Sequence, residues 1–168
     1  NSGYVPLGGV VMTEAVAETF GERAYPGGLT YSGHPLACAA AVGAITAMED
    51  DGVVEHAAHI GTDVLGPGLQ KLASSHPSVG EVRGLGCFFA VELVRNPETR
   101  EGLVPFNASG EAAQPMGEVL NACKSRGLWP FAHFNRIQMA PPLIVTDDEV
   151  GRALEILDEA LQVADSYV

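Results

Sequence analysis

TYSGHPLACAAA, residues 30–41, carries the most specific pattern in this sequence. Hydroxyl side chains at Thr30, Tyr31 and Ser32 come shortly before Pro35, a residue well suited to the first turn of a helix. The alanine-rich residues that follow predict a helix from Pro35 to about Asp50. Because loose amides and hydroxyls at the start of a helix attract anions, the segment predicts a phosphate-binding turn.

The composition is that of a folded globular protein. The 168 residues include 46% hydrophobic and 18% charged residues, and the net charge is −12. This negative charge argues against a nucleic-acid-binding surface. Cys38, Cys87 and Cys123 lie in apolar segments and are expected to be buried, reduced thiols. With no signal peptide visible and no apolar stretch long enough to span a bilayer, we expect a cytoplasmic protein without a membrane partner.

Hydrophobic periodicity and turn residues predict the other elements. The first are a strand over Tyr4–Met12, a short helix that Thr13 caps and that runs through Phe20, and a helix over Val53–Ser75 that Pro67 kinks or divides. Two strand-like runs around Gly84 and Gly86 follow, and then a polar loop over Arg95–Asn107. The last are a helix over Ser109–Arg126 ended by Gly127, short strands in LWPF and RIQMAPPL, and an amphipathic helix that begins with a capping box at Thr146–Glu149.

This order of strands and helices is typical of an α/β or α+β protein. The helix from Pro35 carries small residues nearly all round and has no amphipathic face. We therefore expect the first fifty residues to be part of a larger sheet and its covering helices.

Four segments carry a family resemblance, and they follow one another in the family's order. They are NSGYVPLGGV from Asn1, TYSGHPLACAAA from Thr30, HPSVGEVRGLGCFFAVELV from His76 and APPLIVTDDEV from Ala140. Together they resemble the class III pyridoxal-phosphate aminotransferases, the group of ω-amino acid, taurine and 4-aminobutyrate transaminases.

The resemblance implies an α/β architecture of fold type I, in which a large cofactor-binding domain is followed by a small α+β domain. Residues 1–52 would form the carboxy-terminal end of the large domain with the interdomain helix. Residues 53–168 would form the small domain. The family's enzymes are homodimers that bind pyridoxal 5'-phosphate, and they transfer an amino group from an ω-amino acid, taurine-like or amine donor to a 2-oxo acid.

The resemblance also implies that no catalytic residue lies in this sequence. The family's Schiff-base lysine would lie a few residues upstream of Asn1, whereas Lys71 and Lys124 are expected to be solvated helix residues. We therefore expect the chain to be the carboxy-terminal portion of an aminotransferase and inactive alone. Two alternatives stay open: another pyridoxal-phosphate enzyme on the same scaffold, such as an aminomutase, and a non-catalytic binding or assembly module.

The cofactor-binding candidates are Thr30 and Leu29. By resemblance, the Thr30 hydroxyl and the Leu29–Thr30 backbone bind the cofactor phosphate held by the neighbouring subunit, so the phosphate site is completed in trans. Ser32 and His34 either cap the following helix or lie at the dimer interface.

The substrate-binding candidates are Tyr4, Phe131 and Arg136. Tyr4 would follow the lysine segment and either contact substrate or pack beside the site. Many ω-transaminases carry a mobile arginine about ten residues before the Pro-Pro pair, and here Phe131 stands in that place. Arg136 either takes over the capture of a carboxylate or is a strand-edge residue. Arg83 either binds a carboxylate or forms a structural ion pair.

Two further patterns have plain structural explanations. His56 and His59 stand three residues apart on a predicted helix, but no third ligand is near, so we expect surface histidines and not a metal site. The pair Gly84 and Gly86 lacks the spacing and the strand–helix context of a dinucleotide-binding loop.

Overall fold

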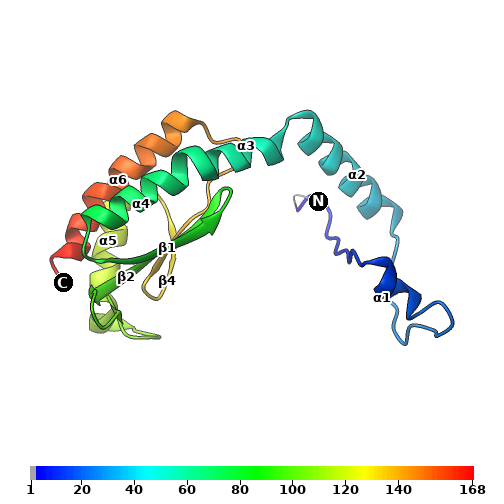
Figure 1. Cartoon of the computed structure of the whole chain (residues 1–168), viewed down its shortest axis with the longest axis horizontal. Helices are drawn as coiled ribbons and strands as arrows, with labels where there is room; N and C mark the ends of the chain where they lie inside the picture. Colours follow the sequence, from blue (N-terminus) through cyan, green and yellow to red (C-terminus); the bar gives the residue numbers. More distant parts are fainter. Residues whose placement is uncertain (1–2) are drawn as a thin grey trace. The chain divides into compact units, whose positions relative to one another are not determined.

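The computed structural model describes residues 3–168, which form two compact units that divide after Gly52 (Figure 1). Asn1 and Ser2, the first residues of the NSGYVPLGGV segment, lie outside the described residues. Gly52 adopts a positive φ of 58°, a conformation that glycine takes up without strain. In the described part of the chain no helix combines the length and hydropathy that a bilayer-spanning segment needs.

The unit at residues 3–52 contains two helices, α1 (Glu14–Glu18) and α2 (Pro35–Asp50). The predicted helix from Pro35 to Asp50 is confirmed. The predicted strand over Tyr4–Met12 is wrong, because residues 6–13 take no regular secondary structure and belong to no strand of the sheet. A strand needs a hydrogen-bonding neighbour.

Two local expectations for this unit are also wrong. Thr13 occupies the N-cap position of α1, but its side chain makes no capping hydrogen bond. Cys38 is exposed, because it lies on a helix of small residues that buries only Ala37. Cys87 and Cys123 are buried as expected, and burial raises the pKa of the Cys123 thiol to about 11.

The unit at residues 53–168 begins with three helical segments that follow one another without a break (Figure 1). They are α3 (Val53–His59), the π-helical segment η1 (Ile60–Leu65) and α4 (Gly66–Ser75). The predicted division of this helix is confirmed, but it falls before Pro67, in the wider turn of η1. A Cβ atom on Gly61 would lie 2.5 Å from the backbone oxygen of Gly86, so this turn packs directly against backbone.

The second unit also contains an antiparallel sheet and two longer helices. The elements are β1 (Val79–Leu85), β2 (Phe88–Asn96), β3 (Glu101–Gly102), the 3₁₀ segment η2 (Gly110–Ala113), α5 (Gln114–Ser125), β4 (Phe131–His133), β5 (Arg136–Met139) and α6 (Asp147–Asp165). The strand order is β1-β2-β5-β4, with the short β3 paired to β2. The predicted polar loop therefore contains a short strand, and of LWPF only Phe131 joins β4.

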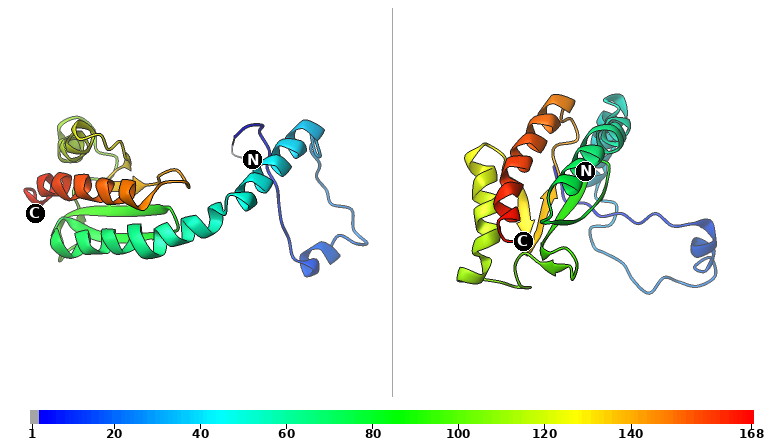
Figure 2. Two further views of the ribbon diagram at one scale, coloured as in Figure 1. Left: turned by 90° about the horizontal axis from the view of Figure 1, so that it is seen from above. Right: turned by 60° about the vertical axis from the view of Figure 1, so that its left-hand side comes forward.

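The core of this unit lies between one face of the sheet and the helices. In β2, buried Phe89, Val91 and Leu93 alternate with partly or fully exposed residues, as a half-covered strand should. They pack with Leu69 of α4 and Leu157 of α6. In the right-hand view of Figure 2, α5, α6 and α4 lie next to one another. The opposite face of the sheet carries no helix of this unit.

Helix α6 begins with the predicted capping box. The Thr146 hydroxyl accepts a hydrogen bond from the Glu149 backbone N–H, and the Glu149 carboxylate accepts one from the Thr146 backbone N–H. The Thr146 backbone N–H and, in second place, the Thr146 hydroxyl donate to the Glu149 carboxylate and lower its pKa.

Candidate functional site

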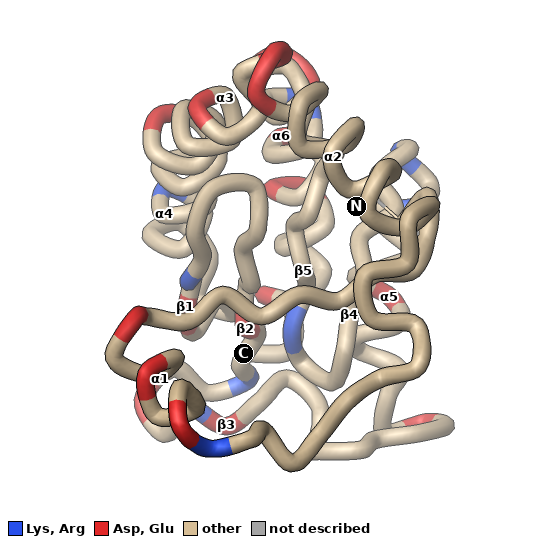
Figure 3. The backbone as a smooth tube through the Cα atoms, turned by 90° about the vertical axis from the view of Figure 1, so that its right-hand side faces the viewer, with Lys and Arg blue, Asp and Glu red and all other residues tan. Residues whose placement is uncertain are grey.

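The open face of the sheet brings together charged residues from three neighbouring strands. In an antiparallel pair, residues that stand opposite each other point to the same face. Glu92 of β2 stands opposite Arg136 of β5, which in turn stands opposite His133 of β4. Figure 3 shows that, going across the sheet, a basic residue on β1 is followed by an acidic residue on β2 and a basic residue on β5.

Arg83 of β1 is held by two glutamates. Its Nη1 lies 2.9 Å from the Glu92 carboxylate and 3.3 Å from the Glu81 carboxylate. The hydrogen bond to Glu92, with support from Glu81, raises the pKa of Arg83. Glu81 also binds Arg100 at 2.9 Å. The structural ion pair considered for Arg83 is therefore present.

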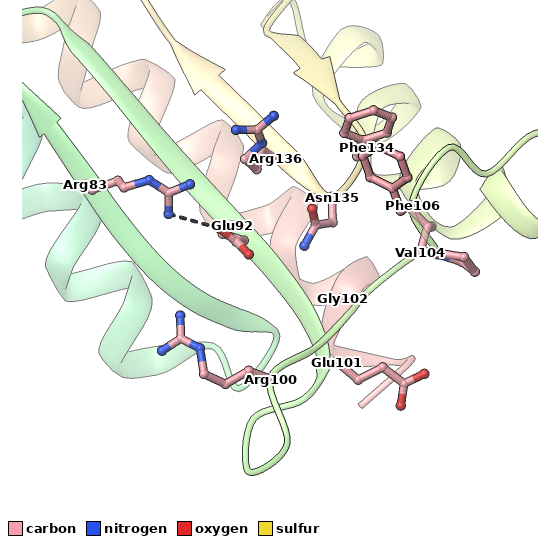
Figure 4. Close-up of a pocket in the computed structure, with 11 residues that line it drawn as sticks. Arg83, Glu92, Arg100, Glu101, Gly102, Val104, Phe106, Phe134, Asn135 and Arg136 are labelled. Atoms are coloured by element: carbon pink, nitrogen blue, oxygen red, sulfur yellow. Dashed lines mark hydrogen bonds and ion pairs between the residues drawn. The ribbon is translucent and has the colours of Figure 1, made fainter.

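Arg136 differs from Arg83 because no described residue pairs with its guanidinium. The side chain is half-buried, and it points toward Arg83 across β2 (Figure 4). β5 lies between β2 and β4, so Arg136 is not a strand-edge residue. An arginine held in place without a partner retains all five N–H donors for an anion.

A tight turn fixes the position of Arg136. Phe134 and Asn135 connect β4 to β5. Phe134 adopts a φ of 55°, a backbone conformation that residues other than glycine rarely adopt. The Asn135 side chain donates to the Leu93 carbonyl at 3.0 Å, and the Asn135 carbonyl accepts from the Leu93 N–H at 2.7 Å. Two hydrogen bonds to β2 thus hold the turn directly before Arg136.

Two hollows border the arginine pair. One, of about 500 Å³, is bounded by Arg83, Arg136 and the aromatic pair Phe106 and Phe134, whose ring centroids lie 4.4 Å apart. The other, of about 450 Å³, extends along the sheet in the opposite direction and has no acidic residue in its lining. The arrangement can bind an anionic group of a small molecule.

The predicted phosphate-binding turn lies in the first unit. The Ser32 N–H donates to the Leu29 carbonyl at 3.1 Å, and Gly33 adopts a φ of 67°. Leu29 and Thr30 are exposed, and neither the Thr30 N–H nor its hydroxyl has a partner among residues 3–168. This donor set fits a phosphate group. His34 occupies the N-cap position of α2 without a capping bond from its side chain.

The structure places the predicted site residues in both units. Phe131 and Arg136 lie on the same face of one sheet, Phe131 being opposite Gln138 of β5. Tyr4, Leu29 and Thr30 lie in the other unit and are exposed. Sequence reasoning missed Gln138, whose position two residues after Arg136 in a strand could have indicated it.

The remaining candidates have structural roles. His59 is exposed and bonds Asp63 and Asp147, which raise its pKa, with Asp63 the larger influence. His56 is partly buried, not a surface residue, and its Nε2 lies 2.7 Å from the Val145 carbonyl oxygen. Within the described residues no group of His, Cys, Asp or Glu side chains could hold a metal ion.

Both lysines are exposed helix residues. The Lys124 ammonium lies 5.2 Å from the centre of the Trp129 ring, a cation–π contact. Gly84 lies within β1, where a Cβ atom would come within 2.3 Å of the Phe88 carbonyl oxygen. Its role is therefore close packing and not the binding of a dinucleotide.

Comparison with known proteins gives matches along almost the whole chain. The family model for aminotransferase class-III matches residues 1–161. A probable gamma-aminobutyrate transaminase 4 from Oryza sativa subsp. japonica is 30% identical over all of this chain, which covers 34% of that protein. A putrescine–pyruvate aminotransferase from Pseudomonas aeruginosa is 32% identical over 95% of this chain and is also covered to 34%.

The solved structures that resemble this chain are also aminotransferases. The taurine:2-oxoglutarate aminotransferase from Bifidobacterium kashiwanohense, solved with PLP and glutamate, matches 98% of this chain at 35% identity and a TM-score of 0.82. An amine transaminase from an uncultivated Pseudomonas species, solved in a PLP-bound form, matches 96% at 33% identity and a TM-score of 0.80. The chain covers 36% of each of these structures.

The expected α/β fold of type I is confirmed by these structural matches. The chain spans about a third of the length of the relatives it matches. With a family model that covers residues 1–161 and relatives at 30% identity or more, the chain belongs to the class III aminotransferases.

Proposed function

We propose that this chain is the carboxy-terminal portion of an aminotransferase that moves an amino group from an ω-amino acid, taurine-like or amine donor to a 2-oxo acid. The observation that carries the proposal is the family match over residues 1–161. Residues 1–52 would complete a large domain and residues 53–168 would be the small domain. The working enzyme would be a cytoplasmic homodimer.

The cofactor of the proposed enzyme is pyridoxal 5'-phosphate, which when bound supplies the electron sink for amino-group transfer. The lysine that holds it would lie upstream of Asn1, so the 168-residue chain would be inactive alone. In this chain, the N–H and hydroxyl of Thr30 and the backbone at Leu29 would bind the phosphate of the cofactor in the neighbouring subunit. Arg136, Phe131 and Tyr4 would contact the substrate, with the Arg136 guanidinium binding its anionic group.

The first experiment restores the upstream residues. The resulting protein should be a yellow dimer that bleaches when an amine donor is added. A protein that binds the cofactor but never bleaches with any donor would contradict the aminotransferase and favour another enzyme on the same scaffold. The 168-residue chain should acquire no covalent cofactor after borohydride treatment.

The contribution of Thr30 in trans can be tested with mixed dimers. One subunit carries Thr30→Val, which keeps the shape and removes the hydroxyl, and the other lacks the upstream lysine. If Thr30 serves the neighbouring subunit, the mixed dimer has one intact site and binds cofactor with unchanged affinity there. If Thr30 serves its own subunit, no intact site exists and the affinity falls about tenfold.

A further inference from the structure

The hollow without acidic residues has a floor made of one small side chain. Ala90 of β2 stands opposite Arg83 of β1 on one side and opposite Gln138 of β5 on the other. Because a methyl group separates two long side chains, the three residues form a trough across the sheet. Its volume is about 450 Å³.

Unused hydrogen-bond donors border this trough. Both ion pairs of Arg83 use its Nη1 atom, which leaves Nε and Nη2 without a partner in residues 3–168. The guanidinium of Arg136 and the side-chain amide of Gln138 likewise have no partner among the described residues. Donors from three side chains therefore border one space, and no carboxylate lies in its lining.

The surrounding charges leave one positive charge unbalanced. Arg83, Arg100 and Arg136 are accompanied by Glu81 and Glu92, and the ion pairs of these glutamates are with Arg83 and Arg100. The carboxylate of Glu101 points away from this group (Figure 4). A single anionic group on a ligand would balance the unpaired charge of Arg136, although the chain as a whole has a net charge of −12.

Beyond the arginines the trough becomes apolar. Leu85 and Phe88, which face each other across the β1–β2 hairpin, are 87% and 59% exposed and line the same hollow. A second anionic group on a ligand would meet either these apolar side chains or the Glu92 carboxylate. Both are unfavourable for a charge.

We propose that this trough binds small monoanions, with a single carboxylate or sulfonate between Arg136, Arg83 and Gln138 and an apolar body on Leu85 and Phe88. The substrate would then be a 2-oxo acid or amino acid with one anionic group and an apolar side chain, in preference to a dicarboxylate. This naming of the substrate rests on the proposed function. The binding site itself rests only on the geometry of the sheet.

Calorimetric titration of the chain with three unreactive probes tests the proposal. They are 4-methylpentanoate, a monoanion with an apolar body; glutarate, a dianion; and 4-methylpentanamide, a neutral analogue. 4-Methylpentanoate should bind at least about tenfold more tightly than either of the others. Equal or tighter binding of glutarate would overturn the monoanion assignment.

Three variants separate charge from shape and folding. Arg136→Gln should weaken binding of 4-methylpentanoate about tenfold or more, whereas Arg152→Gln, which removes the same charge from an exposed position of α6, should not. Ala90→Leu should abolish binding by filling the trough without changing a charge. Unchanged affinity in both Arg136→Gln and Ala90→Leu would show that the ligand binds elsewhere, and the proposal would fail.

The outcomes distinguish this inference from the proposed function, because the titrations need no cofactor and no turnover. Selective binding without aminotransfer in the restored enzyme would refute only the function. Aminotransfer in the restored enzyme without monoanion binding in the trough would refute only the inference.

Discussion

Helices α2 and α6 are similar in length, with 16 and 19 residues, but only α6 belongs to a core. α6 has a capping box and buries Leu157, Leu161 and other residues of one face. α2 has no side-chain capping bond at its N-terminus and buries only Ala37. The same contrast separates the two units, since Ala37 is the only buried residue among residues 3–52.

The difference teaches that two kinds of sequence signal operate in this chain. In the second unit, periodic apolar residues specify both the elements and their packing. In the first, Pro35 and a run of alanines specify a helix through local preference alone. The motif that identifies the family most specifically therefore lies in the unit that has almost no core of its own.

The largest effect is expected from truncating a core residue of α6. Leu157 is fully buried, so Leu157→Ala should destabilise the chain by about 2–5 kcal/mol. Val42→Ala on exposed α2 should change the free energy of unfolding by less than about 0.5 kcal/mol. Urea denaturation measures both. A similar loss for both variants would show that α2 also belongs to a cooperative core.

Glycine-to-alanine substitutions should have opposite signs in the two units. At Gly61 the new Cβ would lie 2.5 Å from the Gly86 backbone oxygen, and we expect a destabilisation of about 1–3 kcal/mol. At Gly43, within α2, no atom lies within 4 Å of the new Cβ, and alanine should stabilise by about 0.5–1 kcal/mol. Thermal unfolding compares the two, and a destabilised Gly43→Ala would contradict the open surroundings of α2.

A buried histidine should make the stability of the second unit depend on pH. Burial lowers the pKa of His76, but hydrogen bonds to Asp165 at 2.6 Å and Asp158 at 3.0 Å together outweigh it and raise the pKa above 6.5. Ser78 donates to the other oxygen of Asp165. The charged imidazole thus ties the α4–β1 junction to α6.

Because the pKa is raised in the folded state, this stabilisation is fully present below pH 6.5 and is lost as the pH rises through the folded-state pKa. Asp165→Asn should cost about 1–3 kcal/mol near pH 6 and less near pH 9. Asp158→Asn, at a more exposed carboxylate, should cost less. Chemical denaturation at several pH values measures this, and a loss that does not change with pH would exclude the charged form.

The smallest effect is expected at the helix caps. Thr146→Ala removes a capping box and should destabilise by about 1 kcal/mol. Thr13→Ala removes no capping bond and should be neutral. Measured by thermal unfolding, a cost at Thr13 equal to that at Thr146 would mean that α1 is capped in solution.

Much of the second unit could be predicted from the sequence. Periodicity located α5 and α6, and glycines located the β1–β2 hairpin. The strand predicted over Tyr4–Met12 failed because strand formation depends on a partner, which no local pattern supplies. Exposed Cys38 has the same explanation, since apolar neighbours in sequence do not guarantee neighbours in space.

The candidate site was predicted only in part. The position of Arg136 shortly before a Pro-Pro pair indicated a binding residue, and the family motif indicated Thr30. The trough at Ala90 could not be predicted, because it depends on the register that sets Arg83, Ala90 and Gln138 side by side. A shift of one residue would place these side chains on the opposite face.

The π-helical segment Ile60–Leu65 has a consequence for the phase of the helix that follows it. A wider turn holds one more residue than an α-helical turn, and each residue rotates the helix by about 100°. Restoring α-helical geometry while keeping all the residues of Ile60–Leu65 would therefore rotate the part of the helix that follows relative to the part that precedes. Leu69 and Leu72, now buried, would no longer share an orientation with Val53. By accommodating this extra residue, the wide turn keeps the buried faces of the two halves of the helix aligned.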